Sequence, residues 1–213
     1  MNAPEKSILS RPYNNRELVP DHAHYFARWA EGSQRARGTM TCHLDLRYGD
    51  APGETLDLFP ARKGDGSCVM FIHGGYWRSL DKRDFSFLAP TFDRELPKDL
   101  WKGGLAISGL YDLRPLVEVE WLNVDLRLDE AAALRLSPAF MPPATRAPVM
   151  TCVGGDESSE FLRQNALLGE RWRAAFAGDV SMPGKNHFSV IDALADAQSA
   201  LFQGARKLMK LDK

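Results

Sequence analysis

The sequence of 213 residues predicts an α/β fold, and two observations lead to that prediction. Apolar runs of strand length, such as CVMFI at 68–72 and PVMTCV at 148–153, recur along the chain and are separated by helical patterns. Glycine-containing turns follow these runs, as in sheets whose strands alternate with helices. We therefore expect a single domain over 1–213, built on a mostly parallel sheet covered by helices.

The expected elements follow from local residue patterns, taken in chain order. An arm and a helix with aromatic residues at helical spacing account for 1–38. Alternation over 41–48 and a second run at 55–59 predict an antiparallel strand pair. The continuous apolar run at 68–72 is typical of a central strand covered on both faces. The later elements are expected to be helix 84–92, strand 105–107, helix 122–135, strand 148–153, helix 158–175, strand 179–182 and helix 188–209.

Composition excludes several classes of protein. Lys and Arg number 27 against 28 Asp and Glu, so no basic excess points to nucleic acid. No apolar stretch approaches the roughly 20 residues of a membrane span, and the N-terminus lacks the apolar core of a signal peptide. Cys42, Cys68 and Cys152 are irregularly spaced, which argues against a disulfide framework. No histidine pair has metal-ligand spacing and no phosphate loop is present. We expect a cytoplasmic protein without metal or cofactor.

Three polar signals fall at the ends of predicted strands. His73-Gly74-Gly75-Tyr76 follows the third strand, Asp156 follows the penultimate one, and His187 comes just after the last. Ligands of such sheets bind beyond the carboxyl ends of the strands. Acyl transfer on a serine needs a nucleophile, a base, a carboxylate and oxyanion donors, and the last three are present in the order expected of α/β-hydrolases.

Each signal also has a simpler interpretation. Two glycines after a strand often form only a tight turn. Asp156 could cap the helix that begins near Ser158. A single loop histidine such as His187 has a catalytic role only through its partners. Their combination favours the catalytic interpretation.

Several stretches resemble bacterial α/β-hydrolases of the kynurenine formamidase (arylformamidase) and esterase family: YNNRELVPDHAHYFARWA, FIHGGYWRSLDKRDFSFLAPTF, LPKDLWKGGLAISGLYDLRPL, VGGDESSEFLRQ and GKNHFSVID. The resemblance implies hydrolysis of a carboxylic ester or an N-aryl formamide. It implies an oxyanion hole at Gly74, Gly75 and Tyr76, with Asp156 as acid and His187 as base. It also implies that Tyr76 and Trp77 line the acyl or aryl pocket.

The nucleophile that the resemblance implies is missing. No serine lies in a G-x-S-x-G pentapeptide. Compared with the family pattern, two central strand–helix units are absent near 92–96, where Phe92 is followed almost at once by Leu96. Ser108, at a strand end, is the best substitute, but no elbow glycine precedes it.

Three interpretations stay open from the sequence. The chain is a serine-type acyl hydrolase, or a catalytically inactive remnant that binds ligands or serves as a scaffold, or the natural polypeptide contains a segment that this sequence lacks. Loss of two central strands leaves apolar faces uncovered, so we expect reduced stability or association with another chain, including a second copy.

Overall fold

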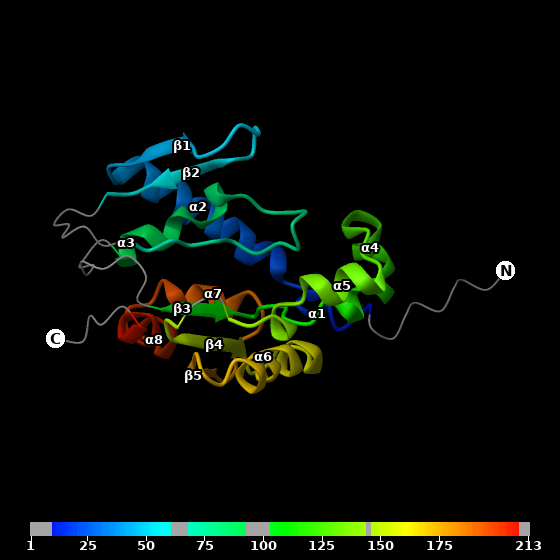
Figure 1. Cartoon of the computed structure of the whole chain (residues 1–213). Helices are drawn as coiled ribbons and strands as arrows, with labels where there is room; N and C mark the ends of the chain where they lie inside the picture. The colour runs from blue at the N-terminus through cyan, green and yellow to red at the C-terminus, as the bar shows by residue number, and fades with distance from the viewer. Residues whose placement is uncertain (1–9, 61–67, 93–102, 144–145, 209–213) are drawn as a thin grey trace.

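The computed structural model describes residues 10–60, 68–92, 103–143 and 146–208, and a three-stranded parallel sheet lies at its centre (Figure 1). The strands are β3 (Gly104–Ile107), β4 (Val149–Gly154) and β5 (Phe176–Met182), in the order β3-β4-β5. β4 is the central strand, and five of its six residues are buried. The parallel sheet expected from these apolar runs is confirmed.

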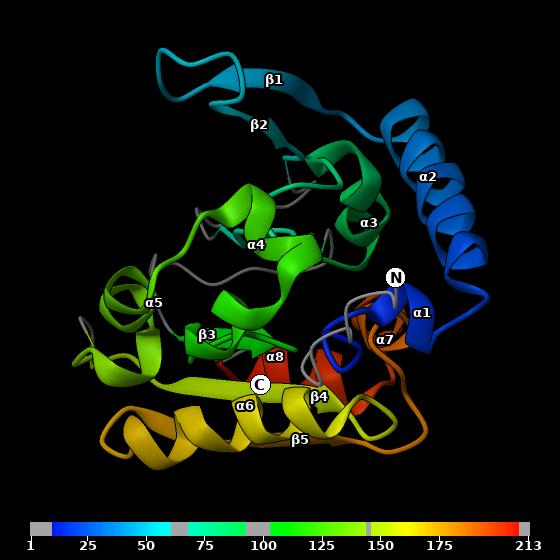
Figure 2. The ribbon, with the colours of Figure 1, turned by 90° about the vertical axis from the view of Figure 1, so that its right-hand side faces the viewer.

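Helices cover both faces of this sheet (Figure 2). α6 (Ser159–Arg171) lies on one face, and α7 (Ser189–Leu194) and α8 (Ala200–Leu208) lie on the other. The main core forms on the second face, where Leu201 of α8 and Val190 of α7 are fully buried with Cys152 of β4. The carboxyl ends of the strands all point toward α1 and α4 in Figure 1.

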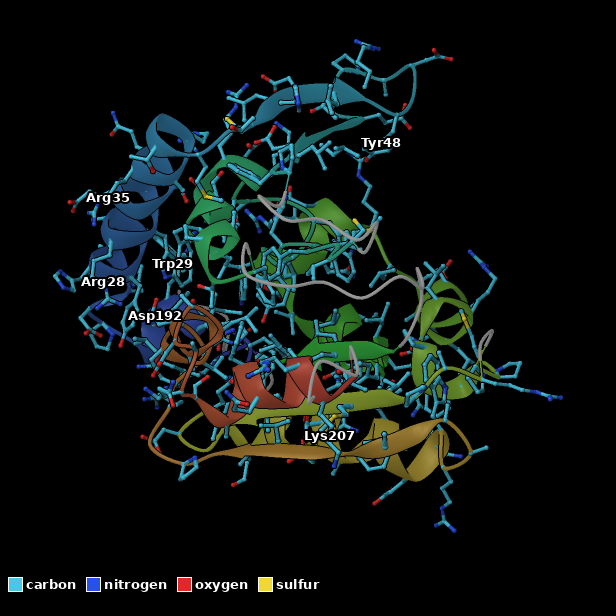
Figure 3. All side chains as sticks on the ribbon, turned by 90° about the vertical axis from the view of Figure 1, so that its left-hand side faces the viewer. Arg28, Trp29, Arg35, Tyr48, Asp192 and Lys207 are labelled. Atoms are coloured by element: carbon cyan, nitrogen blue, oxygen red, sulfur yellow. The ribbon has the colours of Figure 1, made fainter. Side chains whose placement is uncertain are left out.

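The N-terminal lobe sits beyond α7 and carries a separate hairpin. Its elements are α1 (Asn15–Leu18), α2 (His22–Thr39), β1 (His43–Arg47), β2 (Thr55–Leu58), η1 (Lys82–Leu88) and α3 (Ala89–Phe92). β1 and β2 pair antiparallel, as the alternation predicted. Trp29 of α2 donates from Nε1 to Asp192 Oδ1 of α7 at 2.6 Å, which fastens the lobe to the sheet (Figure 3).

Two long helices of the prediction are each divided in the structure. The region 122–135 holds α4 (Glu120–Leu126) and α5 (Glu130–Leu136), which follow η2 (Arg114–Glu118) and precede η3 (Pro138–Phe140). Arg127 adopts a left-handed φ of +51° that ends α4, and the Asp129 carboxylate caps α5 by accepting from Ala132 N at 2.6 Å. The expected helix over 188–209 is likewise interrupted between α7 and α8. None of the described helices combines the length and apolar composition needed to cross a membrane.

The prediction of a strand at 68–72 is wrong. This segment has no strand conformation, and no backbone group in it is hydrogen bonded to another described residue. Met70 is 63% exposed and Ile72 is 81% exposed, so the segment is not covered on both faces. An apolar run becomes a strand only when neighbouring strands satisfy its backbone groups. Of the predicted junction at 92–96, only Phe92 lies within the described residues.

Candidate active site

A histidine–carboxylate pair lies beyond the carboxyl ends of β4 and β5. His187 Nδ1 is 2.6 Å from Glu157 Oε2, and the Glu157 side chain is completely buried. A carboxylate can only accept here, so Nδ1 carries the proton and Nε2 is left as an acceptor. The imidazole packs on Phe161 at 4.8 Å between ring centroids. The ring is therefore held in one orientation and one tautomer, as a general base requires.

The second oxygen of Glu157 is held from the sheet. Glu157 Oε1 accepts from Gly154 N at 2.8 Å and from Ser108 Oγ at 2.5 Å. Ser108 follows β3 with a left-handed φ of +48°, and its N–H donates to Cys152 O at 2.8 Å. Its hydroxyl therefore contacts the acid and not the base. This contact helps to orient Glu157.

The structure places Glu157, one residue beyond the predicted acid, against His187. Asp156 is exposed, and its N–H donates to Lys185 O at 3.0 Å in the turn after β4. Asp156 does not cap α6 either, because Ser158 is the N-cap and accepts from Phe161 N. The sequence signal for Glu157 was the adjacent pair Asp156-Glu157, because the acid of an α/β-hydrolase can be an aspartate or a glutamate.

The His-Gly-Gly loop presents backbone N–H groups that have no protein acceptor among the described residues. The N–H groups of Gly74, Gly75 and Tyr76 donate to none of the residues that the structure describes. The Gly75 carbonyl fixes the loop by accepting from Arg78 N at 3.1 Å and from Ser79 N at 3.0 Å. Gly75 has a φ of +119°, and a Cβ there would lie 1.9 Å from the Ser79 carbonyl oxygen. Only glycine fits this position, which keeps the loop N–H groups uncovered.

The N-terminal arm holds Tyr76 from behind. The Tyr76 hydroxyl donates to Tyr13 O at 2.8 Å, and the Asn15 side-chain amide lies 3.5 Å from the same hydroxyl. Burial raises the pKa of the Tyr76 phenol, so it stays neutral and donates. The arm also contacts the turn between β4 and α6, where Ser158 Oγ donates to Pro12 O at 2.7 Å. The arm therefore connects the loop to the turn that carries Glu157.

One cavity joins these parts. It has a volume of about 1090 Å³ and lies between the N-terminal lobe and the parallel sheet. Gly74, Gly75, Tyr76, Ser108 and His187 all line it. The Trp77 ring also borders the cavity but is 74% exposed, which places it at the rim. Within the described ranges, no group of three or more His, Cys, Asp or Glu side chains is placed to hold a metal ion.

The chain is similar to known proteins in sequence and in structure. No family model matches the chain. Kynurenine formamidase from Salmo salar is 26% identical, with 84% of this chain and 86% of that protein covered. Kynurenine formamidase from Danio rerio is also 26% identical, with coverages of 78% and 81%. A crystal structure of a protein from Silicibacter sp. TM1040, named as a thioesterase, has a TM-score of 0.81 and 26% identity. The match covers 92% of this chain and 98% of that one.

The fold and these similarities are those expected of an α/β-hydrolase of the arylformamidase and esterase type, which the sequence motifs also indicated. The two formamidases match most of the length of the chain.

Proposed function

We propose that this site hydrolyses a carboxylic ester or an N-aryl formamide by acyl transfer. The observation that supports this most is the His187–Glu157 pair, because His187 lines the same cavity as Gly74, Gly75 and Tyr76, whose N–H groups have no acceptor among the described residues. His187 Nε2 is the base, Glu157 orients the ring, and the loop N–H groups stabilise the tetrahedral oxyanion. The similarity to proteins named kynurenine formamidase supports an N-aryl formamide as substrate.

The nucleophile of this proposal lies on a segment that the present sequence lacks. The alignment with the Salmo salar protein runs over 255 positions and yet covers 84% of only 213 residues. Roughly 75 positions therefore face no residue here, which is the length of two strand–helix units at about 30 or more residues each. Phe92 and Gly103, on either side of the expected junction, both line the cavity. These facts support an internal deletion.

A second candidate is a catalytically inactive protein that binds the same class of small molecule. It is favoured by the missing G-x-S-x-G motif and by Ser108, whose hydroxyl is committed to Glu157. The cavity and the loop would then act only in binding.

Three measurements distinguish these candidates. Intact mass of the natural polypeptide shows whether it has the 23.8 kDa of this sequence or includes a further segment. The protein of natural length is then labelled with a fluorophosphonate and assayed on N-formylkynurenine and p-nitrophenyl acetate. Labelling and turnover that are lost in His187→Ala support the hydrolase. Absence of both, in a folded protein that still binds kynurenine, overturns it in favour of the binding protein.

We also propose that the protein resides in the cytoplasm. Cys42, Cys68 and Cys152 are all free thiols in the structure. Cys68 is exposed, and an exposed free thiol suits a reducing compartment. Fractionation of the source cells, with the protein detected by an antibody, tests this directly.

A further inference from the structure

The loop that carries His187 is held by hydrogen bonds from its own side chains. Asn186 Oδ1 accepts from Phe188 N at 3.0 Å and from Ser189 N at 2.9 Å. Ser189 Oγ in turn accepts from Asn186 N at 2.8 Å. These three hydrogen bonds enclose His187 between residues 186 and 189, where α7 begins. The main chain is therefore fixed both before and after the imidazole.

The amide nitrogen of Asn186 bonds to the N-terminal lobe. Because Oδ1 faces two backbone N–H groups, Nδ2 is the atom that faces Tyr25, and it donates to the Tyr25 hydroxyl at 3.2 Å. Tyr25 lies on α2, 161 positions earlier in the sequence. A side chain of the lobe thus completes the hydrogen bonds of the Asn186 amide.

Aromatic packing holds α2 against the same loop. The ring of Phe188 lies at centroid distances of 5.8, 5.3 and 6.2 Å from three rings of α2, those of Tyr25, Phe26 and Trp29. Phe188 also packs edge-on against His187 at 5.6 Å. The imidazole is therefore connected to α2 by a second route, through aromatic rings instead of hydrogen bonds.

A charged contact fastens α2 to α7 beside this loop. Arg28 forms an ion pair with Asp192, and Trp29 Nε1 donates to the same carboxylate (Figure 3). The Arg28 guanidinium also lies over the Tyr25 ring, 4.9 Å from its centroid. This contact restricts the ring that carries the hydroxyl bonded to Asn186.

We propose that Asn186 is a positioning residue for His187 and that α2 of the N-terminal lobe acts on it through Tyr25. This inference rests on the proposed function, in which His187 is the base. Glu157 holds Nδ1 of the imidazole, whereas Asn186 fixes the backbone from which the ring extends, and both determine where Nε2 lies in the cavity. Neither Asn186 nor Tyr25 lines the cavity, so both act through His187 and do not touch substrate.

Two variants separate these contacts. Asn186→Ala removes every contact of the amide, whereas Tyr25→Phe removes only the hydroxyl and keeps the ring against Phe188. The first readout is the His187 Nδ1 proton, measured by NMR, which needs no turnover. We expect its exchange with water to become roughly ten- to one-hundred-fold faster in Asn186→Ala, as for the loss of one or two hydrogen bonds. Tyr25→Phe should accelerate the exchange by a few-fold.

The second readout is turnover of N-formylkynurenine by the protein of natural length. In Asn186→Ala, kcat should fall by about 10- to 100-fold while KM changes by less than about threefold, because the base is displaced and the binding surface is kept. The double variant of Tyr25→Phe and Asn186→Ala should match Asn186→Ala alone, since the hydroxyl acts through the amide.

Asp129→Ala is the matched control, because Asp129 caps a helix of similar length, α5, and does not line the cavity. It should lower stability about as much as Asn186→Ala does and leave the His187 proton and kcat unchanged. A residue that only caps α7 would give the same result in Asn186→Ala.

Unchanged proton exchange in Asn186→Ala, or unchanged kcat in an active protein, therefore overturns the proposal. Additive effects of Tyr25→Phe and Asn186→Ala on the exchange overturn the part played by α2. Absence of hydrolysis in the wild type contradicts the proposed function instead, and the proton exchange still decides whether Asn186 positions His187.

Discussion

Two regions of the molecule have similar apolar sequences but different structures. In the parallel sheet, PVMTCV becomes β4, which pairs with β3 and β5 and is almost entirely buried. In the segment before the His-Gly-Gly loop, CVMFI at 68–72 forms no strand and exposes Met70 and Ile72. The difference lies in the neighbours, because β4 has a strand on each side and 68–72 has no strand beside it among the described residues. Apolar composition thus defines a candidate strand, and non-local partners decide whether it forms.

The largest effect expected concerns Glu157, which lies just beyond the end of β4. Glu157→Gln keeps the side-chain volume but cannot hold His187 in the same charge state, so hydrolysis by the active protein should fall by about 10²- to 10⁴-fold. Asp156→Asn should change the rate little, because that side chain is exposed. Turnover of N-formylkynurenine measures both variants.

A second readout of the same pair needs no activity. The proton on His187 Nδ1 should give a downfield NMR resonance that Glu157→Gln removes and Asp156→Asn retains. Loss of that resonance in Asp156→Asn would mean that Asp156, and not Glu157, holds His187.

The next largest effect compares side-chain packing in the core of the sheet with packing in the segment 68–72. Leu201→Ala empties a fully buried site and should lower the free energy of unfolding by about 2–5 kcal/mol. Ile72→Ala removes an 81% exposed side chain and should cost about 0.5 kcal/mol or less. Urea denaturation of both variants gives the comparison.

A large cost for Ile72→Ala would mean that 68–72 is covered in solution. We propose that, in this case, a second copy of the chain covers residues 68–72. Size exclusion across a range of concentrations would then show an oligomer that Ile72→Ser disperses.

An intermediate effect is expected within the His-Gly-Gly loop, where two adjacent glycines should differ. Gly75→Ala must adopt a φ of +119° with its Cβ against the Ser79 carbonyl, so we expect about 1–3 kcal/mol of destabilisation or a displaced loop. Gly74→Ala meets no atom within 4 Å and should fold normally. Thermal melts of the two variants, with activity measured alongside, test the difference. Equal stability of the two variants would contradict this loop geometry.

The smallest effect concerns pH. Burial alone would raise the pKa of Asp112, but hydrogen bonds from Arg114 and the charges of Arg114 and Arg163 lower it below its ordinary 3.8. A carboxyl with a lowered pKa in the folded state stabilises the fold above its unfolded pKa, and this contribution is lost as pH falls through the folded value. Asp112→Asn should therefore be less stable at neutral pH and lose less stability below about pH 4. Chemical denaturation at several pH values measures how the free energy of unfolding depends on pH in the wild type and in Asp112→Asn.

The sequence supplied much of the fold and the outline of the site. β4 and the His187 loop could be predicted because apolar runs and strand ends are local features. Glu157 could not, since the turn that carries Asp156 outward and returns Glu157 toward Gly154 depends on hydrogen bonds between distant loops. The strand at 68–72 was wrongly predicted for the same reason, because its pairing depends on partners far along the chain. The N-terminal arm carried no sequence signal for its contacts with Tyr76 and Ser158.

The arm has a consequence for the time at which the site forms. Tyr13 donates to Glu160, 147 residues away, and Pro12 accepts from Ser158, 146 residues away. Contacts of such long sequence separation close slowly, because the loop entropy is lost before the contact is gained. During synthesis the arm leaves the ribosome long before these partners, which follow about 146 residues later. The His-Gly-Gly loop and the turn that carries Glu157 should therefore be joined in one of the last steps of folding.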